Sequence, residues 1–304
     1  MSVDLTAAAR VLARQQSLIT TEQADEARIS RKGCQRLVDR GVWERLDHGV
    51  YGPTGVPLTP QRRLMLALLL APAGSLASHR SCAALLAVGG LVNPAPEITI
   101  PRGSTLRRPW LTVHESTDLA LADRCVVEGI PSTGPRRLAM DLGSVVSEER
   151  YRHTVRELRS RYGVGFEQLL RTYLRHKRSG RNGGAALRDW LDRYADVGGI
   201  AESGLEQLAL DAFLDAALQP TAQHWVQVEG GARYRIDLAF PALMIAVEVD
   251  GSQHEERPAR LADAERDAAL EAMGWTVIRI KAKTFATDLA RAIELVRRAS
   301  VVHG

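Results

Sequence analysis

The sequence predicts a multidomain α+β protein built from three successive segments. Its 304 residues are enough for about two domains of average size, or three small ones. A hydrophobic content of 45% and a charged content of 25% are ordinary for a chain that buries a core. Helix and strand signals fall into three groups, which we place at residues 1–54, 58–188 and 200–304.

Charge and cysteine usage narrow the class of protein. The net charge is +4, which favours polyanionic partners such as DNA. The three cysteines, Cys34, Cys82 and Cys125, form no CxxC pair, which argues against a zinc ribbon or a disulfide framework and favours a reducing cytoplasm. The N-terminus lacks a signal-peptide layout, and the longest apolar run, residues 64–73, is too short to span a bilayer. We therefore expect a cytoplasmic protein with no membrane contact.

The first segment carries three short helix signals. The first helix is expected over residues 5–15, where the apolar residues have helical spacing. The second begins with a capping box between Thr20 and Gln23. The third begins after Ser30 as N-cap and ends at Gly41.

A hairpin signal follows, with two short strands around the turn at residues 47–49. Three helices and a hairpin predict a winged helix-turn-helix, whose third helix enters the DNA major groove while basic residues contact phosphates. Arginine and lysine are also good helix formers, so a solvated helix face is the alternative. We favour DNA docking because the whole pattern is present. The candidate DNA contacts are Arg31, Lys32, Arg36 and Arg40.

The middle segment is predicted to be an α/β domain that ends in a basic helix. Its basic belt, within residues 171–188, fits either a solvated helix with a linker or a phosphate-contacting surface, and both alternatives stay open. The expected elements are a helix at 62–70, a helix from Ser78, strands at 97–102, 111–116 and 124–133, and two further helices.

The third segment is predicted to form a mixed sheet flanked by helices, in the order α-β-β-β-α-β. The expected elements are a helix at 202–218, strands at 225–228, 234–240 and 243–249, a helix at 260–273, a strand at 276–280 and a helix at 288–298.

Acidic residues lie on the central strands of this segment. Asp237 lies within one strand, and Glu248 and Asp250 lie at the polar end of the next, with the period-two spacing that puts them on one face. If the two strands pair as an antiparallel hairpin, Asp237 lies near Glu248, and Glu206 on the preceding helix could complete the cluster. Converging acids are costly without a cation, and Mg²⁺ takes hard oxygen ligands, to which the Val249 carbonyl could add.

The third segment resembles the PD-(D/E)XK nuclease superfamily and, more narrowly, the DUF559 group, relatives of the very-short-patch-repair (Vsr) endonucleases. The resemblance covers about the last third of the chain. It implies a divalent-metal-dependent DNA endonuclease or nickase that uses Mg²⁺ or Mn²⁺. The matching residues are Glu206, Arg235-Ile236-Asp237, Val247-Glu248-Val249-Asp250-Gly251 with His254, Asp263, Arg266 and Asp267, and Gly274-Trp275-Thr276-Val277-Ile278-Arg279.

One departure from the superfamily concerns proton transfer. Asp250 stands where the wider superfamily has lysine. We expect His254 to accept the proton of the attacking water, as the Vsr resemblance also implies, with Lys281 in reserve.

Several of these residues also have structural explanations. Asp250-Gly251 could initiate a turn, and His254 could be a solvated loop residue. Glu206 could be an ordinary helix-surface acid, and Arg266 with Asp267 an exposed ion pair. Asp237 and Glu248 have few such explanations, because each follows or lies within an apolar strand.

The first half of the chain resembles the AbiEi family of type IV antitoxins. TTEQADEARISRKGCQRLVDRGVWERLDHGVYG is similar to their N-terminal winged helix, and SHRSCAALL through GIPSTGPRRLAMDL is similar to the region after it. Members of that family bind DNA as autoregulators, which implies a DNA-docking module here, with Arg31, Lys32 and Arg36 as candidate contacts.

Three hypotheses follow. The first is a metal-dependent endonuclease targeted to DNA by the winged helix. The second is a DNA-binding regulator or antitoxin whose nuclease-like domain is catalytically idle, and the third is an enzyme that acts on RNA. Double-strand cutting by a single-site enzyme would call for a homodimer, and the sequence leaves open a partner protein encoded nearby.

Overall fold

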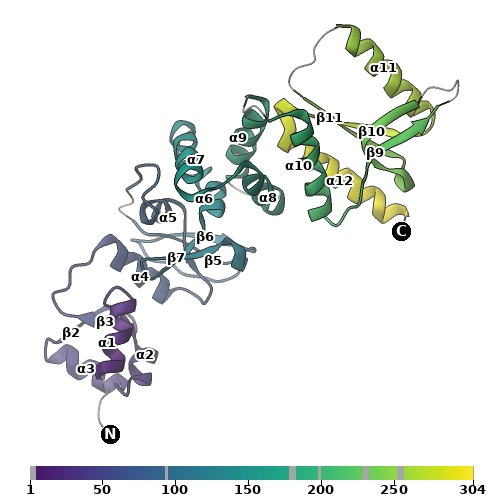
Figure 1. The fold of residues 1–304 in the computed structure, drawn as a ribbon. Coiled ribbons are helices and arrows are strands. Elements are labelled where there is room, and N and C mark those ends of the chain that lie inside the picture. Colours follow the sequence, from purple (N-terminus) through teal and green to yellow (C-terminus); the bar gives the residue numbers. More distant parts are fainter. Residues whose placement is uncertain are drawn as a thin grey trace. The chain divides into compact units, whose positions relative to one another are not determined.

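The computed structural model describes residues 5–92, 95–177, 183–197, 200–228, 233–251 and 257–303 (Figure 1). The chain divides into two compact units, Met1–Val164 and Gly165–Gly304. We describe each unit by itself. In the described residues, no helix combines the length and apolar character needed to cross a membrane.

The first unit begins with a winged helix. Its second helix has the predicted capping box, in which Thr20 and Gln23 exchange hydrogen bonds, and Ser30 accepts from the backbone N–H of Gly33 at the start of the third helix. The three strands form an antiparallel sheet in the order β1-β3-β2, which confirms the predicted wing. The elements are α1 (Leu5–Arg14), β1 (Ile19–Thr20), α2 (Thr21–Glu26), α3 (Arg31–Asp39), β2 (Trp43–Asp47) and β3 (Val50–Pro53).

The rest of the first unit is a five-stranded sheet in the order β6-β5-β4-β8-β7, with helices packed on it. The single strand expected at 124–133 is instead a hairpin of two strands, because the chain turns at Gly129, whose φ is +79°. The elements are α4 (Pro60–Leu70), β4 (Leu76–Ala77), α5 (His79–Leu85), β5 (Glu97–Pro101), β6 (Thr112–Ser116), η1 (Leu121–Asp123), β7 (Arg124–Val127), β8 (Ile130–Thr133), α6 (Pro135–Leu142) and α7 (Glu148–Tyr162).

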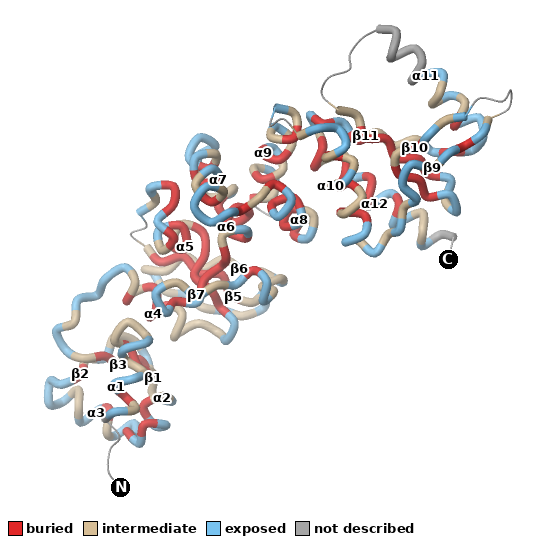
Figure 2. Tube along the Cα trace, viewed as in Figure 1, coloured by how far each residue is buried: buried red, intermediate tan, exposed pale blue. Residues whose placement is uncertain are grey.

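The second unit holds a four-stranded mixed sheet in the order β12-β11-β10-β9. The pairs β9–β10 and β10–β11 are antiparallel and β11–β12 is parallel, which confirms the predicted mixed sheet. The strand β11 is buried almost throughout (Figure 2). The elements are α8 (Phe166–His176), α9 (Gly184–Val197), α10 (Glu202–Asp215), β9 (Thr221–Gln227), β10 (Arg233–Phe240), η2 (Pro241–Leu243), β11 (Ile245–Asp250), α11 (Arg257–Ala272), β12 (Thr276–Lys281), η3 (Ala282–Thr284) and α12 (Phe285–His303).

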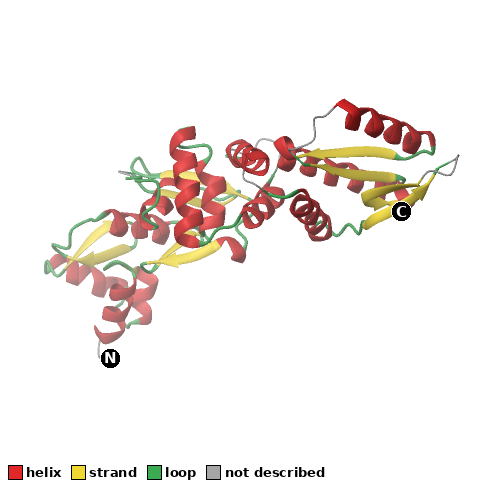
Figure 3. Ribbon diagram, turned by 45° about the horizontal axis from the view of Figure 1, so that its top comes forward, coloured by secondary structure: helices red, strands yellow, loops and turns green. Residues whose placement is uncertain are grey.

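The second unit begins earlier than the predicted nuclease segment at 200–304. It includes α8 and α9, of which α8 and the first residues of α9 fall within the predicted middle segment at 58–188. Asp192 on α9 accepts hydrogen bonds from Ala286 and Thr287 on α12, and Phe166 on α8 stacks on Tyr194 of α9. The domain boundaries at 54–58 and 188–200 stay predictions, and Figure 3 shows the helices around the sheet of this unit.

Candidate functional site: the acid cluster at the end of β11

The strand register brings two of the predicted acids together. Leu238 on β10 pairs with Val247 on β11, so the next position on each strand sets Asp237 opposite Glu248. On the other side of β11, Glu248 pairs with Arg279 of β12. Because paired residues point to the same face of a sheet, Asp237, Glu248 and Arg279 share one face. We call the four acids Asp237, Glu248, Asp250 and Glu206 the acid cluster.

A backbone group orients Asp237. The N–H of Val249 donates to Oδ2 of Asp237 over 3.0 Å, so the carboxylate of β10 bonds to the neighbouring strand. Such a bond fixes the direction of the side chain. The backbone N–H of Val249 thus positions the carboxylate of Asp237. That the carbonyl of Val249 binds a metal ion stays a prediction.

Glu248 is the most perturbed acid of the cluster. It is 4% exposed, and burial, together with the negative charge of Asp237, raises its pKa to about 7. Arg266 forms an ion pair with Glu248 and opposes this rise. A carboxyl group that titrates near neutral pH inside a cluster of acids is typical of a functional site, although ion-pair networks also produce it.

Two arginines neutralise part of the cluster. Arg279 donates from Nη1 to Asp250 over 2.9 Å and from Nε and Nη2 to Asp267 over 2.9–3.0 Å. Arg266 from α11 binds Glu248. The expectation of an exposed pair between Arg266 and Asp267 is therefore wrong: Arg266 pairs with Glu248 and Asp267 with Arg279.

The helix α10 adds two more acids. Glu206 accepts a hydrogen bond from Gln223 of β9 over 3.2 Å. Burial raises the pKa of Glu206, and the charges of Asp237 and Glu202 raise it further. A Cβ built on Gly251 would lie 3.3 Å from the Cβ of Glu202, so the first turn of α10 lies against the end of β11. Sequence reasoning missed Glu202, and only its place one helical turn before Glu206 could have indicated it.

Two residues are candidates for proton transfer. His254 lies outside the described residues, so its role stays a prediction. Lys281 is exposed and pairs in register with Asp250, the residue that stands in the usual lysine position. The neighbouring strand β12 thus places Lys281 beside Asp250 of β11.

The donor set fits a hard divalent cation bound through two carboxylates. Among the described residues, no three of these acids bring one ligand atom each to within 4.8 Å of one another. Asp237 and Glu248, however, lie close enough that the charge of Asp237 raises the pKa of Glu248. Mg²⁺ commonly takes one or two carboxylates and completes its shell with water and phosphate oxygens, so the metal role of Asp237 and Glu248 is compatible with this geometry and stays a prediction.

The third helix of the winged helix presents the predicted basic residues. Arg31, Lys32, Arg36 and Arg40 are all exposed, while Cys34 between them is buried in the core. The wing is tied to the rest of its unit, because Arg108 donates to both carboxylate oxygens of Asp47 over 3.0 Å. A basic helix face on a fixed wing is compatible with docking in a DNA groove.

Comparison with known proteins supports the assignment of both ends of the chain. Residues 216–299 match the model of a restriction endonuclease-like domain, REase_MTES_1575, and residues 7–54 match the AbiEi antitoxin transcriptional regulator family. Two proteins of Mycobacterium tuberculosis, described as uncharacterized proteins MT2308 and Rv2248, are each 36% identical over 103 residues, which is 33% of this chain and 37% of theirs. The match thus spans little more than a third of these relatives.

Among solved structures, the RV2827C protein from Mycobacterium tuberculosis is 20% identical. The superposition covers 69% of this chain and 82% of that chain, with a TM-score of 0.43. The family matches show that the N-terminal end of the chain is a winged helix similar to antitoxin regulators. The C-terminal end is a domain similar to restriction endonucleases.

Proposed function

We propose that this protein is a divalent-metal-dependent DNA endonuclease or nickase that its winged helix targets to DNA. The observation that carries the proposal is the pair Asp237 and Glu248 on adjacent strands of a restriction endonuclease-like domain, with Glu248 buried and its pKa raised to about 7. Two carboxylates that repel each other in a buried setting are stabilised by a bound cation.

Each residue has a distinct task in this proposal. Asp237 and Glu248 would bind Mg²⁺ or Mn²⁺, and the N–H of Val249 holds Asp237 in place. A bound cation polarises the scissile phosphate and lowers the pKa of a bound water. His254 would take the proton of the attacking water, and Lys281 would place a positive charge near the phosphate from β12.

Arg266 competes with any cation at Glu248. Its guanidinium already neutralises that carboxylate, so a metal ion must displace it or share the carboxylate with it. We therefore expect modest affinity for Mg²⁺ in the absence of DNA, and tighter binding when phosphate oxygens of the substrate complete the metal shell.

Plasmid nicking tests the proposal. Supercoiled plasmid is incubated with the full chain and Mg²⁺ or Mn²⁺, beside Asp237→Asn and Glu248→Gln. We expect the wild type to relax the plasmid and both variants to lose activity by more than about 100-fold, because loss of even an outer partner of a metal ligand costs about 10–100-fold. Glu294→Gln, which removes an exposed acid paired with Arg298 on α12, serves as the control and should retain activity.

A second function is favoured by the two arginines. Arg266 and Arg279 neutralise Glu248 and Asp250, and Asp250 stands in the usual lysine position, as expected of an idle nuclease-like domain. In that case the protein is a DNA-binding regulator, in line with the AbiEi match at residues 7–54. The same assay distinguishes the two: DNA binding without cleavage under any metal, or cleavage unchanged in Asp237→Asn, rules out the enzyme.

DNA docking by α3 has its own test, which both functions share. Alanine at Arg31, Lys32 or Arg36 should weaken binding to duplex DNA and reduce the slope of log affinity against log salt by about 1 for each phosphate that is no longer neutralised. Arg10 is an exposed arginine on α1, so Arg10→Ala is the matched control and should leave the slope unchanged. If Arg10→Ala reduced the slope as much as the α3 variants do, DNA binding would depend on the net charge of the protein and not on α3.

A further inference from the structure

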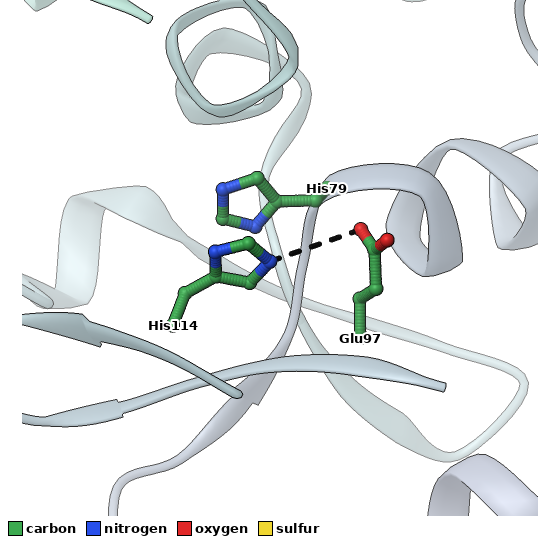
Figure 4. A group of neighbouring side chains, drawn as sticks. All are labelled: His79, Glu97 and His114. Atoms are coloured by element: carbon green, nitrogen blue, oxygen red, sulfur yellow. Dashed lines mark ion pairs between the residues drawn. The ribbon is translucent and has the colours of Figure 1, made fainter. Parts of the chain in front are cut away.

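Three side chains of the first unit converge far from the acid cluster in sequence. His79 is the first residue of α5, Glu97 is the first residue of β5, and His114 lies on β6 (Figure 4). One ligand atom of each lies within 4.8 Å of the other two. We call them the histidine site.

The sheet register explains why they meet. On the parallel pair β5–β6, Thr99 pairs with His114, so Glu97, two residues before Thr99, lies on the same face as His114. The hydroxyl of Thr99 donates to Ser78 Oγ over 2.8 Å, which brings the start of α5 onto this face. His79 follows directly, with φ of +50°, in a left-handed region that a non-glycine residue rarely occupies.

Burial disfavours the charged form of both imidazoles. Burial lowers the pKa of His79 to about 4, and burial also lowers the pKa of His114. The rings stack with centroids 3.5 Å apart and planes 15° apart, an arrangement that two imidazolium cations would oppose. Ser78 Oγ lies 2.9 Å from Nδ1 of His79, whereas Nε2 of His114 is buried without a hydrogen-bond partner in the described part of the chain. A neutral imidazole nitrogen is the form that binds metals.

Glu97 supplies the charge of the site. It is fully buried, and its Oε2 lies 3.9 Å from Nε2 of His114, the contact drawn in Figure 4. Arg80 donates from Nε to Oε1 over 2.6 Å and from its backbone N–H to Oε2 over 3.0 Å. Partners that orient a carboxylate in this way are typical of the outer shell of metal sites.

We propose that His79, Glu97 and His114 bind a divalent transition-metal ion of the Zn²⁺ class. Two imidazoles and one carboxylate are a ligand set that Zn²⁺ and related ions accept, and it leaves one position for water or another ligand. Because an imidazole lone pair lies in the plane of its ring, one of the two stacked rings must turn about its side-chain torsions when both nitrogens bind the ion. The ion gives the buried nitrogen of His114 a partner, and it shares the carboxylate of Glu97 with Arg80, which forms an ion pair with it. It also links α5 to β5 and β6, so it stabilises the sheet of the first unit.

Cobalt serves as the spectroscopic probe, because Co²⁺ in a tetrahedral nitrogen and oxygen environment absorbs visible light and Zn²⁺ does not. The full chain, carrying Asp237→Asn and Glu248→Gln so that the acid cluster does not contribute, is stripped of metal and titrated with Co²⁺. We expect one equivalent to produce the visible band and one equivalent of Zn²⁺ to abolish it. Zn²⁺ should also raise the thermal midpoint of the protein.

Ligand variants locate the ion. In the same background, His114→Gln and Glu97→Gln should each weaken Co²⁺ binding by more than about 100-fold, since changes to outer partners alone cost about 10–100-fold. His153→Gln is the control, because His153 is an exposed histidine paired with Glu157 on α7 of the same unit. It should bind Co²⁺ as the background does. Circular dichroism confirms that each variant is folded.

Two results overturn the proposal. The first is the absence of the visible band when the folded background protein is titrated with Co²⁺. The titration is limited to concentrations too low for Co²⁺ to bind exposed histidines nonspecifically. The other is a band that persists in the folded His114→Gln protein and disappears in His153→Gln. If both ligand variants unfold, the background titration alone decides, because a stacked neutral histidine pair without a metal role gives neither the band nor the Zn²⁺-dependent rise in the thermal midpoint.

Discussion

The acid cluster of the second unit and the histidine site of the first respond to burial in opposite directions. Burial raises the pKa of Glu248 to about 7 and lowers that of His79 to about 4. In both cases the low-dielectric surroundings disfavour the charged form. Burial thereby holds the acid near its titration point and favours the neutral form of the imidazole.

Under the two proposals, this difference predicts which cation each site prefers. At the acid cluster a cation must compete with Arg266 and with a proton, so only a site completed by further oxygens retains a hard ion such as Mg²⁺. At the histidine site no proton has to leave at neutral pH, which favours a borderline ion such as Zn²⁺. In the two proposals, the same physical cause thus prepares two sites for different metal ions.

The largest expected effect is that a variant at either site abolishes the activity of that site and leaves the other unchanged. Asp237→Asn should lower plasmid nicking by more than about 100-fold and leave Co²⁺ binding unchanged, whereas His114→Gln should do the reverse. Nicking rates and Co²⁺ titrations on the same preparations provide the comparison. If either variant loses both properties while folded, the two sites are not independent and the comparison fails.

Opposite pH dependences come next. The folded-state pKa of Glu248 lies above its ordinary value of 4.5, so its stabilising contribution is full below pH 4.5 and is lost as pH rises through about 7. The folded-state pKa of His79 lies below its ordinary 6.5, so its contribution is present above pH 6.5 and is lost as pH falls through about 4. Each change is at most about 3 kcal/mol, at about 1.4 kcal/mol per pKa unit.

Urea denaturation of the metal-free protein between pH 4 and 8 measures both contributions. Glu248→Gln should remove the decline of the unfolding free energy with rising pH, and His79→Asn should remove the decline with falling pH. Asparagine tolerates the left-handed backbone of His79. His153→Asn, at an exposed position, should keep the wild-type profile. A profile that no variant alters would mean that other groups set the pH dependence.

A smaller effect is expected at Arg266. Arg266→Met leaves the buried carboxylate of Glu248 without its cation and should lower the free energy of unfolding by about 2 kcal/mol at pH 8, less than for a fully buried pair because Arg266 is 22% exposed. At pH 5 the cost should largely disappear, because Glu248 then binds a proton. Arg298→Met, which breaks an exposed pair, is the control at below about 0.5 kcal/mol. An equal cost of Arg266→Met at both pH values would contradict the raised pKa of Glu248.

The smallest effect is expected at Gln223. Gln223→Ala removes the hydrogen bond to Glu206, which is partly exposed, and should change the free energy of unfolding by less than about 1 kcal/mol. Nicking should fall by no more than a few fold, because Glu206 supports the metal ligands and is not expected to bind the ion. A large loss of nicking without unfolding would give Glu206 a direct role in metal binding.

Sequence reasoning predicted what local signals determine. The caps at Thr20 and Ser30 located the helices of the winged helix, because side-chain caps are encoded within a few residues. The turn after Phe240 made β10 and β11 a hairpin, and the hairpin brought Asp237 to Glu248. Period-two spacing then sufficed to orient the acids.

What the sequence did not reveal depends on contacts between distant segments. The partners of Arg266 and Arg279 follow from the packing of α11 and from the parallel register of β11 on β12, and no tight turn encodes either. The histidine site needed the parallel pairing of β5 with β6, so SHRSCAALL could be read only as a helix start. The role of His254, outside the described residues, stays a prediction.

The pairing of β11 with β12 has a consequence for folding. Parallel strands have no hairpin turn to set their alignment, and the pairs Glu248–Arg279 and Asp250–Lys281 set opposite charges side by side. A slip of one residue would turn every side chain of β11 to the other face and separate Glu248 and Asp250 from Arg279 and Lys281. The charges at this end of β11 therefore favour the correct strand pairing over a shifted one, whatever ligand the site binds.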